Sequence, residues 1–293
     1  MHGLNSLKTA MLLGLLSAIF VVGGGAIAGQ NGLMLGLVMA AGMNFFSYFF
    51  SDKMALASYS AQPLTAESNP EIYARLAPIV QRLAEKMKLP MPKLWLLPED
   101  QPNAFATGRN PAHASVAVTE GILRLMNDRE LEGVLAHELG HVLHRDILIS
   151  SVAATLAAAI SYLGYFGRFM GGGGDRGFGE GNDDRRGSGI LMIFLAPLAA
   201  ALIQMAISRS REYDADAASA ACLGTPDNLI SGLRKLELGV QRVPMDDAST
   251  STAHLFILNP FRGGGMARWF STHPSTADRI ARLEALRGPV VRQ

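Results

Sequence analysis

The sequence has little that would support nucleic-acid binding or a disulfide-stabilised fold. Its formal net charge is only +1, whereas a phosphate-binding surface normally shows a clustered excess of Lys and Arg, so nucleic acid is set aside as a partner. The one cysteine, Cys222, leaves no internal disulfide and no need for an oxidising compartment. Charged residues make up 17% of the chain and hydrophobic residues 49%, a balance that indicates a membrane protein with a water-facing part.

Four apolar runs have the length of a membrane-spanning helix. They are Thr9–Ala28, Gly32–Phe50, Ile147–Phe166 and Gly189–Ile207, each close to the roughly 20 residues that a ~30 Å hydrocarbon core requires. The third and fourth runs are rich in Ala and Gly, so they could instead pack as a hairpin partly within the protein. The first run could also be a cleavable signal, because Lys8 precedes it and small residues end it.

The distribution of charge predicts which side of the membrane the domain occupies. Residues 51–145 hold ten Lys and Arg, whereas the link between the first two runs is uncharged, so the positive-inside rule puts the domain in the cytoplasm. We predict a mainly α membrane protein with two transmembrane helices in residues 1–50 and an apolar helix pair with a Gly-rich loop in residues 146–208. The water-facing domain is assembled from residues 51–145 and 209–293.

Between the second and third runs, the pattern predicts a compact portion with a small β-sheet. Residues 69–89 are predicted to form an amphipathic helix, with Pro90 just past its end and an apolar face of Ile72, Leu76, Ile79, Leu83 and Met87. Residues 93–97 and 115–119 are typical of short strands, and residues 98–112 are interpreted as their connection. A further helix starts at Asn127, with Glu130 at capping-box spacing.

The helix that starts at Asn127 contains the sequence HELGH. His137 and His141 are four residues apart, so both imidazoles project from one helical face, as they must to share one small cation. Glu138 can take a proton from a water molecule held by Zn²⁺ and deliver it to a leaving amine. The alternative is a pair of solvent-facing histidines, but apolar neighbours such as Leu139 favour a semi-buried site. The pattern therefore indicates peptide hydrolysis without a covalent intermediate.

Zinc needs a third protein ligand, and the segment after the fourth run offers two carboxylates. Glu212 and Asp216 share a helical face, so one could coordinate zinc while the other accepts the ring N–H of a ligating histidine. Locally, an exposed acidic face balanced by Arg209 and Arg211 fits equally well. The order of the segments favours the functional interpretation. The third and fourth apolar runs lie between the histidines and Glu212, and whether both runs or neither cross the membrane, Glu212 returns to the side of the histidines.

Together these motifs resemble the membrane-bound HtpX-type zinc metalloproteases, which are related to the CAAX prenyl proteases. The resemblance covers nearly the whole chain, because two apolar runs, AHELGHVLHRD, an apolar pair, EYDAD and THPSTADRI occur in the family's order. It implies a gluzincin-like catalytic domain that binds one Zn²⁺ through His137, His141 and Glu212. It further implies Glu138 as general base and acid, with Asp216 supporting a ligand.

The resemblance also places residues 103–108, NAFATG, at the substrate-binding edge of the cleft, with Asn103, Ala104 and Phe105 as contacts. From the residues alone, an exposed edge there could pair with an extended peptide backbone, or the segment could be an ordinary turn.

A capped helix is predicted from Ser275, with Leu283 and Leu286 on its buried face. The resemblance places its start near the active site, where His273 would stabilise a developing oxyanion and Arg279 would hold Glu212. His273 as a surface turn residue is the alternative.

The sequence therefore predicts a zinc-dependent endopeptidase of the bacterial inner membrane, facing the cytoplasm, that cleaves misfolded or membrane proteins during stress. A prenyl-peptide protease uses the same chemistry and is the alternative within the enzyme class. Against it, the chain has only four apolar runs, too few for a larger helical chamber that could hold a lipid. A zinc-binding scaffold would need no base, so Glu138 speaks against it. A transporter would often carry a charged residue within a span, and none of the four runs does.

Overall fold

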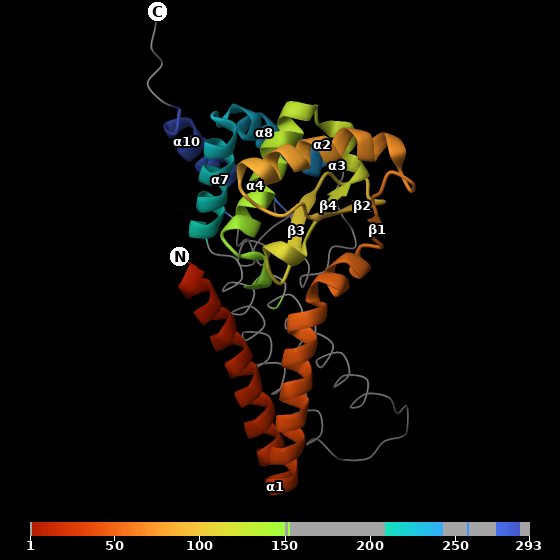
Figure 1. Ribbon diagram of the computed structural model, residues 1–293. Coiled ribbons are helices and arrows are strands. Elements are labelled where there is room, and N and C mark those ends of the chain that lie inside the picture. Colours follow the sequence, from red (N-terminus) through yellow and green to blue (C-terminus); the bar gives the residue numbers. More distant parts are fainter. Residues whose placement is uncertain (1, 150–151, 153–208, 243–256, 258–273, 288–293) are drawn as a thin grey trace, which may run out of the picture.

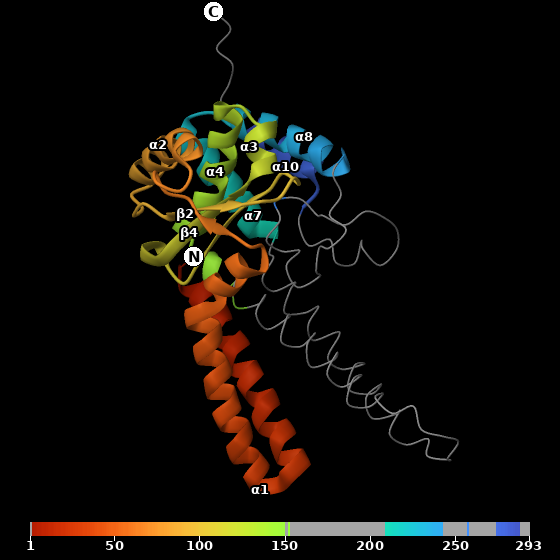
Figure 2. The ribbon, with the colours of Figure 1, turned by 90° about the vertical axis from the view of Figure 1, so that its right-hand side faces the viewer.

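The computed structural model describes residues 2–149, 152, 209–242, 257 and 274–287 (Figure 1). A helical domain with one small mixed sheet stands on a long helical hairpin, which projects away from the domain in two perpendicular views (Figures 1 and 2). The predicted mostly helical chain with a small sheet is thereby confirmed. Most of the third apolar run, all of the fourth and the Gly-rich loop lie outside the described residues.

The hairpin is α1 (His2–Ser58), a helical run that turns back at Gly29, where φ is +57°. Glycine adopts this left-handed conformation without the steric cost that a Cβ brings. Asn44 Nδ2 donates to Ser17 Oγ at 2.8 Å across the two limbs. A Cβ on Gly36 would lie 2.3 Å from the carbonyl oxygen of Phe20, so glycine there lets the limbs pack closely.

Within the described residues, Gly29–Phe50 is the one helical segment whose length and composition would allow it to cross a membrane. Large apolar side chains are exposed along it, namely Leu33, Met34, Leu35, Leu37, Val38, Phe45, Phe46 and Phe49. The other predicted run, Thr9–Ala28, forms the first limb of α1, and its crossing of a membrane stays a prediction.

The sheet has the strand order β1-β2-β4-β3. Its strands are β1 (Gln62–Pro63), β2 (Lys93–Leu97), β3 (Ala104–Gly108) and β4 (Ala114–Thr119). β2 and β4 run parallel, and the other neighbouring pairs are antiparallel. The two predicted strands are confirmed, whereas the interpretation of residues 98–112 as a connection alone is wrong, because they contain β3. The residues of β3 are mostly small and do not alternate between apolar and polar, so the sequence pattern does not predict a strand there. The strand forms because its backbone pairs with that of β4.

Helices cover the sheet and complete the domain. They are α2 (Pro70–Lys86), the 3₁₀ helix η1 (Pro111–His113), α3 (Glu120–Leu125), α4 (Asp128–Leu143), α7 (Arg209–Leu223), α8 (Asp227–Arg242) and α10 (Thr276–Ala285). The predicted apolar face of α2 is confirmed, with Leu76 and Leu83 fully buried. The predicted capping box of Asn127 and Glu130 forms at the start of α4.

The predicted start of α10 is also confirmed, because the Ser275 side chain accepts a hydrogen bond from the backbone N–H of Asp278 at 3.0 Å. Leu283 is fully buried, as expected. The expectation that Leu286 is buried is wrong, because the helix ends at Ala285 and Leu286 is 51% exposed.

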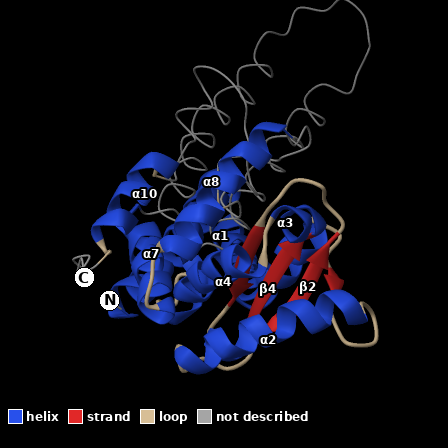
Figure 3. Ribbon diagram, turned by 90° about the horizontal axis from the view of Figure 1, so that it is seen from above, coloured by secondary structure: helices blue, strands red, loops and turns tan. Residues whose placement is uncertain are grey.

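Helix α4 lies at the centre of the domain, between the sheet on one side and α7 and α8 on the other (Figure 3). Two of its glycines sit at helix crossings. A Cβ on Gly133 would lie 2.5 Å from the backbone nitrogen of Leu229 in α8, and one on Gly140 would lie 3.0 Å from Cα of Ala215 in α7. The glycine of HELGH thus lets α7 approach the histidine face of α4.

Candidate metal centre

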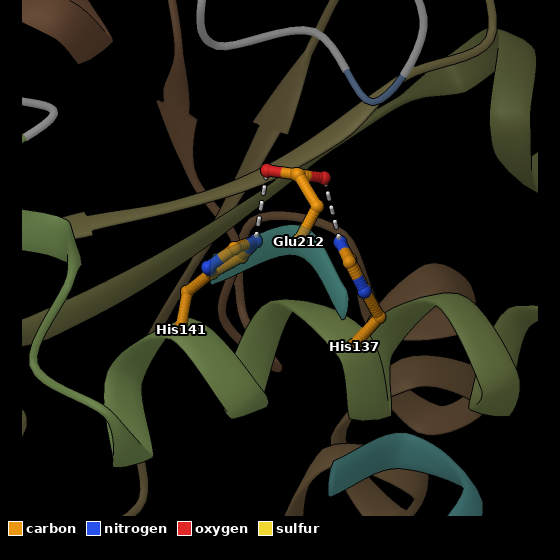
Figure 4. Close-up of side chains that lie close together, drawn as sticks. All are labelled: His137, His141 and Glu212. Carbon is orange, nitrogen blue, oxygen red and sulfur yellow. Dashed lines mark ion pairs between the residues drawn. The ribbon is translucent and has the colours of Figure 1, made fainter. Parts of the chain in front are cut away.

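The two histidines of α4 point to the same side of the helix, one turn apart (Figure 4). Their ring centroids are 4.8 Å apart and the rings are nearly perpendicular. His137 is buried, whereas His141 keeps 17% of its side chain exposed. The pair therefore forms one wall of a largely buried site with limited access from solvent.

Helix α7 supplies a carboxylate opposite the two rings (Figure 4). One Glu212 oxygen lies 3.7 Å from His137 Nε2, and the other lies 3.6 Å from His141 Nε2. One potential ligand atom from each of the three residues lies within 4.8 Å of the others. Two imidazole nitrogens and a carboxylate in this arrangement are a donor set that suits Zn²⁺.

The far nitrogen of His137 is held by Asp216, one turn after Glu212 in α7. Asp216 Oδ1 lies 2.9 Å from His137 Nδ1. Arg279 of α10 donates to both Asp216 oxygens, from Nε at 3.0 Å and from Nη2 at 2.6 Å. Burial would raise the pKa of Asp216, but Arg279 and His137 outweigh it and lower that pKa. Asp216 is therefore an anion that orients the ring.

Arg279 has a different main partner from the one predicted. Its Nη1 lies 3.7 Å from Glu212, farther than its two contacts with Asp216. Nη1 also donates to the backbone carbonyl of Ile257 at 3.4 Å. Arg279 is fully buried and connects α10 to the site, with its shorter contacts to Asp216 and a longer one to Glu212.

The far nitrogen of His141 is held by a residue that the sequence interpretation missed. Asp146 Oδ2 lies 3.3 Å from His141 Nδ1, and Asp146 is 2% exposed. Asp146 returns to the helix because Arg145 adopts a left-handed φ of +58° and the Asp146 N–H donates to the His141 carbonyl at 2.9 Å. The signal in the sequence was an aspartate five residues after His141, which helical periodicity alone does not place near the ring.

Glu138 reaches across to the sheet from the same turn of α4. Its Oε2 accepts a hydrogen bond from the backbone N–H of Ala106 in β3 at 3.0 Å. Burial raises the pKa of Glu138 and outweighs the opposing influence of His137 and His141. A carboxylate whose pKa is raised toward neutrality is suited to accept a proton and release it again.

The charges around the histidines match a divalent cation. Glu138, Asp146, Glu212 and Asp216 are four buried carboxylates, and Arg211 and Arg279 are two buried guanidinium groups, which leaves a formal charge of −2. Burial would lower the pKa of His141, but Asp146, Glu212 and Glu138 outweigh it and raise that pKa to about 9. The excess negative charge thus attracts a proton when no metal ion is bound, and a divalent cation would neutralise it.

The predicted substrate-binding residues lie in and beside β3. Asn103, Ala104 and Phe105 are each at most 3% exposed, so their side chains are not an open surface. Asn103 Oδ1 accepts from the backbone N–H of Ile257 at 3.2 Å, and the Phe105 ring lies 5.8 Å from that of Tyr59. The contact of this strand with the site comes from the next residue, Ala106, whose backbone N–H donates to Glu138. His273 lies outside the described residues.

Comparisons with known proteins identify the family of this chain. Residues 70–287 match the sequence model of peptidase family M48. A protease HtpX homolog of Methylibium petroleiphilum is 51% identical over 284 residues, with 96% of this chain and 98% of the relative covered. One of Ralstonia pickettii is 52% identical over 281 residues, covering 95% of this chain and 96% of the relative.

The crystal structure of S. mikatae Ste24p has a similar fold, with a TM-score of 0.54 and 18% identity. The match covers 96% of this chain and 65% of that chain. Because the family model and the bacterial relatives span most of the sequence, including both histidines and Glu212, the chain belongs to peptidase family M48 and is a metallopeptidase.

Proposed function

We propose that this chain is a membrane-embedded zinc endopeptidase in which His137, His141 and Glu212 hold one Zn²⁺ and Glu138 carries the proton. The observation behind the proposal is that both histidine Nε2 atoms face the Glu212 carboxylate, while both Nδ1 atoms are taken by aspartates. A bound Zn²⁺ would polarise the scissile carbonyl and lower the pKa of a water molecule.

Glu138 performs the proton transfers. Its raised pKa and its position one residue from His137 suit it to take a proton from the attacking water and pass it to the leaving amine. The hydrogen bond from the Ala106 N–H fixes the carboxylate between α4 and β3. We further propose that His273, which lies outside the described residues, stabilises the developing oxyanion, as the family resemblance implies.

Asp216 and Asp146 orient the two rings, and Arg279 fixes Asp216. An anion on Nδ1 keeps the Nε2 lone pair directed at the metal and increases the basicity of the ring. Arg279 belongs to α10 and Asp216 to α7, so residues far apart in the sequence together fix the orientation of the His137 ring.

The edge of β3 is the proposed binding site for substrate, at residues Asn103, Ala104 and Phe105. Asn103 O accepts from the N–H of Thr119 in β4, whereas the Ala106 N–H points to Glu138 on the other side. Because backbone groups alternate along a strand, Ala104 shares the outward direction of Ala106. An extended peptide paired with this edge would lie beside Glu138 and be bound with little sequence preference.

The membrane placement also belongs to this proposal. The curated relatives are bacterial proteins called protease HtpX homologs, and α1 contains a segment able to span a bilayer. The ten Lys and Arg of residues 51–145 favour a cytoplasmic domain at the inner membrane. Substrates of such a site are unfolded or membrane proteins, removed as part of quality control under stress.

The test compares the wild type with Glu138→Gln, purified in detergent and loaded with zinc. We expect one zinc per chain in both, and cleavage of an unfolded casein by the wild type alone. Glu132→Gln is the matched control, because Glu132 lies on α4 but faces Arg82 at 3.7 Å, and it should keep both zinc and activity.

Two other results would count against the proposal. Zinc bound without cleavage of any unfolded or prenylated peptide would favour a zinc-binding scaffold without turnover. Loss of zinc from the wild type during gentle dialysis would contradict the proposed ligand set itself.

A further inference from the structure

Four basic residues, called here the basic collar, lie where the α1 hairpin meets the domain: Lys53 in α1, and Arg109, Arg145 and Arg209 in the domain. Lys53 follows the apolar segment Gly29–Phe50, and Arg109 follows the last residue of β3. Arg145 follows the C-cap of α4, and Arg209 is the first residue of α7. The ends of these elements lie toward α1 in both side views (Figures 1 and 2).

Within the described residues, no carboxylate neutralises the cations of the basic collar. Lys53, Arg145 and Arg209 are exposed and Arg109 is half-buried, and none of them forms an ion pair with a carboxylate of the described residues. On the rest of the domain, several arginines are paired: Arg75 with Asp128, Arg124 with Asp100, Arg234 with Glu284 and Arg287 with Asp227.

In the part of the chain that the structure describes, few acidic residues lie beside the four cations in the sequence. Residues 101–119, which include Arg109, contain no Asp or Glu. Asp146 and Glu212 are buried in the metal centre, and Asp52 is the acidic neighbour of Lys53. The collar therefore keeps a positive charge toward α1.

Aromatic rings place the basic collar at the edge of the apolar segment. Lys53 Nζ lies 5.2 Å from the centroid of the Phe50 ring, and Arg109 Cζ lies 5.2 Å from that of Phe49. Aromatic rings beside Lys and Arg are typical of the boundary between hydrocarbon and headgroups. In the sequence, Arg145 lies two residues before the third apolar run and Arg209 lies two residues after the fourth.

From these observations we infer that the basic collar binds the headgroups of anionic phospholipids and thereby holds the metal-binding domain against the bilayer surface. Cations near an anionic bilayer are attracted to its phosphates, with about a fivefold gain in binding for each Lys or Arg close to the surface. Since Arg109 follows β3 directly, the same contact sets the height of the β3 edge above the lipid. The inference rests on the proposed membrane placement but not on peptide hydrolysis.

The test titrates the detergent-solubilised full chain with phosphatidylglycerol or phosphatidylcholine and counts bound lipids by native mass spectrometry. The wild type should bind phosphatidylglycerol at least about tenfold more tightly than phosphatidylcholine, as expected for several cations acting together. The collar variant Lys53→Gln, Arg109→Gln, Arg145→Gln, Arg209→Gln should lose this preference. It should keep its zinc, because none of the four side chains is a proposed metal ligand and Arg145 positions Asp146 through its backbone rather than its side chain.

The matched control removes four positive charges from other parts of the domain: Lys86→Gln, Lys88→Gln, Arg129→Gln and Arg234→Gln. It should keep the preference for phosphatidylglycerol. A preference that survives in the collar variant, or that falls equally in the control, would overturn the inference. Binding of neither lipid by the wild type would count against the membrane placement as well.

Salt provides a second measurement that depends on no variant. Raising the salt concentration from about 0.15 M to about 1 M shortens the screening length from about 8 Å to about 3 Å, so an electrostatic preference should fall. A preference in the wild type that is insensitive to salt would contradict the role of the cations.

Discussion

Each histidine of the HELGH pair is held at the nitrogen that faces away from Glu212. Asp216 lies 2.9 Å from Nδ1 of His137, and Asp146 lies 3.3 Å from Nδ1 of His141. Both aspartates are buried, so water competes little for these contacts. The two rings are thus oriented for metal binding by the protein itself.

Replacing Asp146 by Asn should weaken zinc binding without removing a ligand. Asn can still accept the Nδ1–H of His141, but it lacks the charge that makes the ring more basic, so we expect zinc affinity to fall about tenfold. Competition with a chromophoric chelator measures this affinity. Asp128→Asn, an exposed aspartate at the start of α4, is the control. An affinity equal to that of the wild type would show that Asp146 does not support His141.

At the scale of elements, α4 is fixed at its start as well as at its histidine end. Glu130 completes the capping box by accepting the Asn127 N–H at 3.0 Å. The same carboxylate accepts from Lys235 at 2.7 Å and from Ser231 at 2.7 Å, both in α8. Burial would raise the pKa of Glu130, but Lys235, Ser231 and the capping bond outweigh it and lower that pKa.

This lowered pKa predicts how the stability of the domain depends on pH. The unfolded chain has an ordinary Glu pKa near 4.5, so the contribution of Glu130 is present above that pH and is lost as the pH falls through the lower folded pKa. Glu130→Gln should lower the free energy of unfolding by about 1 kcal/mol at pH 7 and leave it unchanged at a pH below the lowered pKa of Glu130 in the folded chain. Thermal melting in detergent across this range measures the difference. A difference that persists at low pH would mean that packing, rather than charge, is lost.

The sequence predicted those parts of the site that a single helix determines. Spacing alone placed His137 and His141 on one face of α4, because helix geometry is local. It left Glu212 and Asp216 undecided, since only the packing of α7 against Gly140 decides which one faces both rings. Asp146 was missed because a left-handed residue after the helix, Arg145, turns the chain so that Asp146 lies beside His141. Strand β3 was missed because its residues are mostly small and it is stabilised by pairing with a later strand, β4.

At the scale of the whole molecule, the hairpin and β3, the strand proposed to bind substrate, share one hydrophobic cluster. Ala55, Leu56, Tyr59, Leu97, Phe105 and Ala117 form this cluster, separately from the main core. Tyr59 follows the end of α1, and its ring lies 5.8 Å from that of Phe105 in β3. The main core, by contrast, holds α4 between the sheet and α8. The hairpin therefore supports the β3 edge directly, although the M48 family model begins only at residue 70.

Tyr59→Ala should consequently impair substrate binding more than metal binding. Removing the ring leaves a cavity beneath Phe105, which lets β3 shift while His137, His141 and Glu212 stay in place. We expect KM for an unfolded substrate to rise severalfold at unchanged zinc affinity, and the free energy of unfolding to fall by about 3 kcal/mol. Tyr73→Ala is the matched control, because Tyr73 packs on the main core from α2 and does not belong to the cluster that joins the hairpin to β3. If both variants melt earlier yet raise KM equally, the hairpin anchors the domain without positioning the strand.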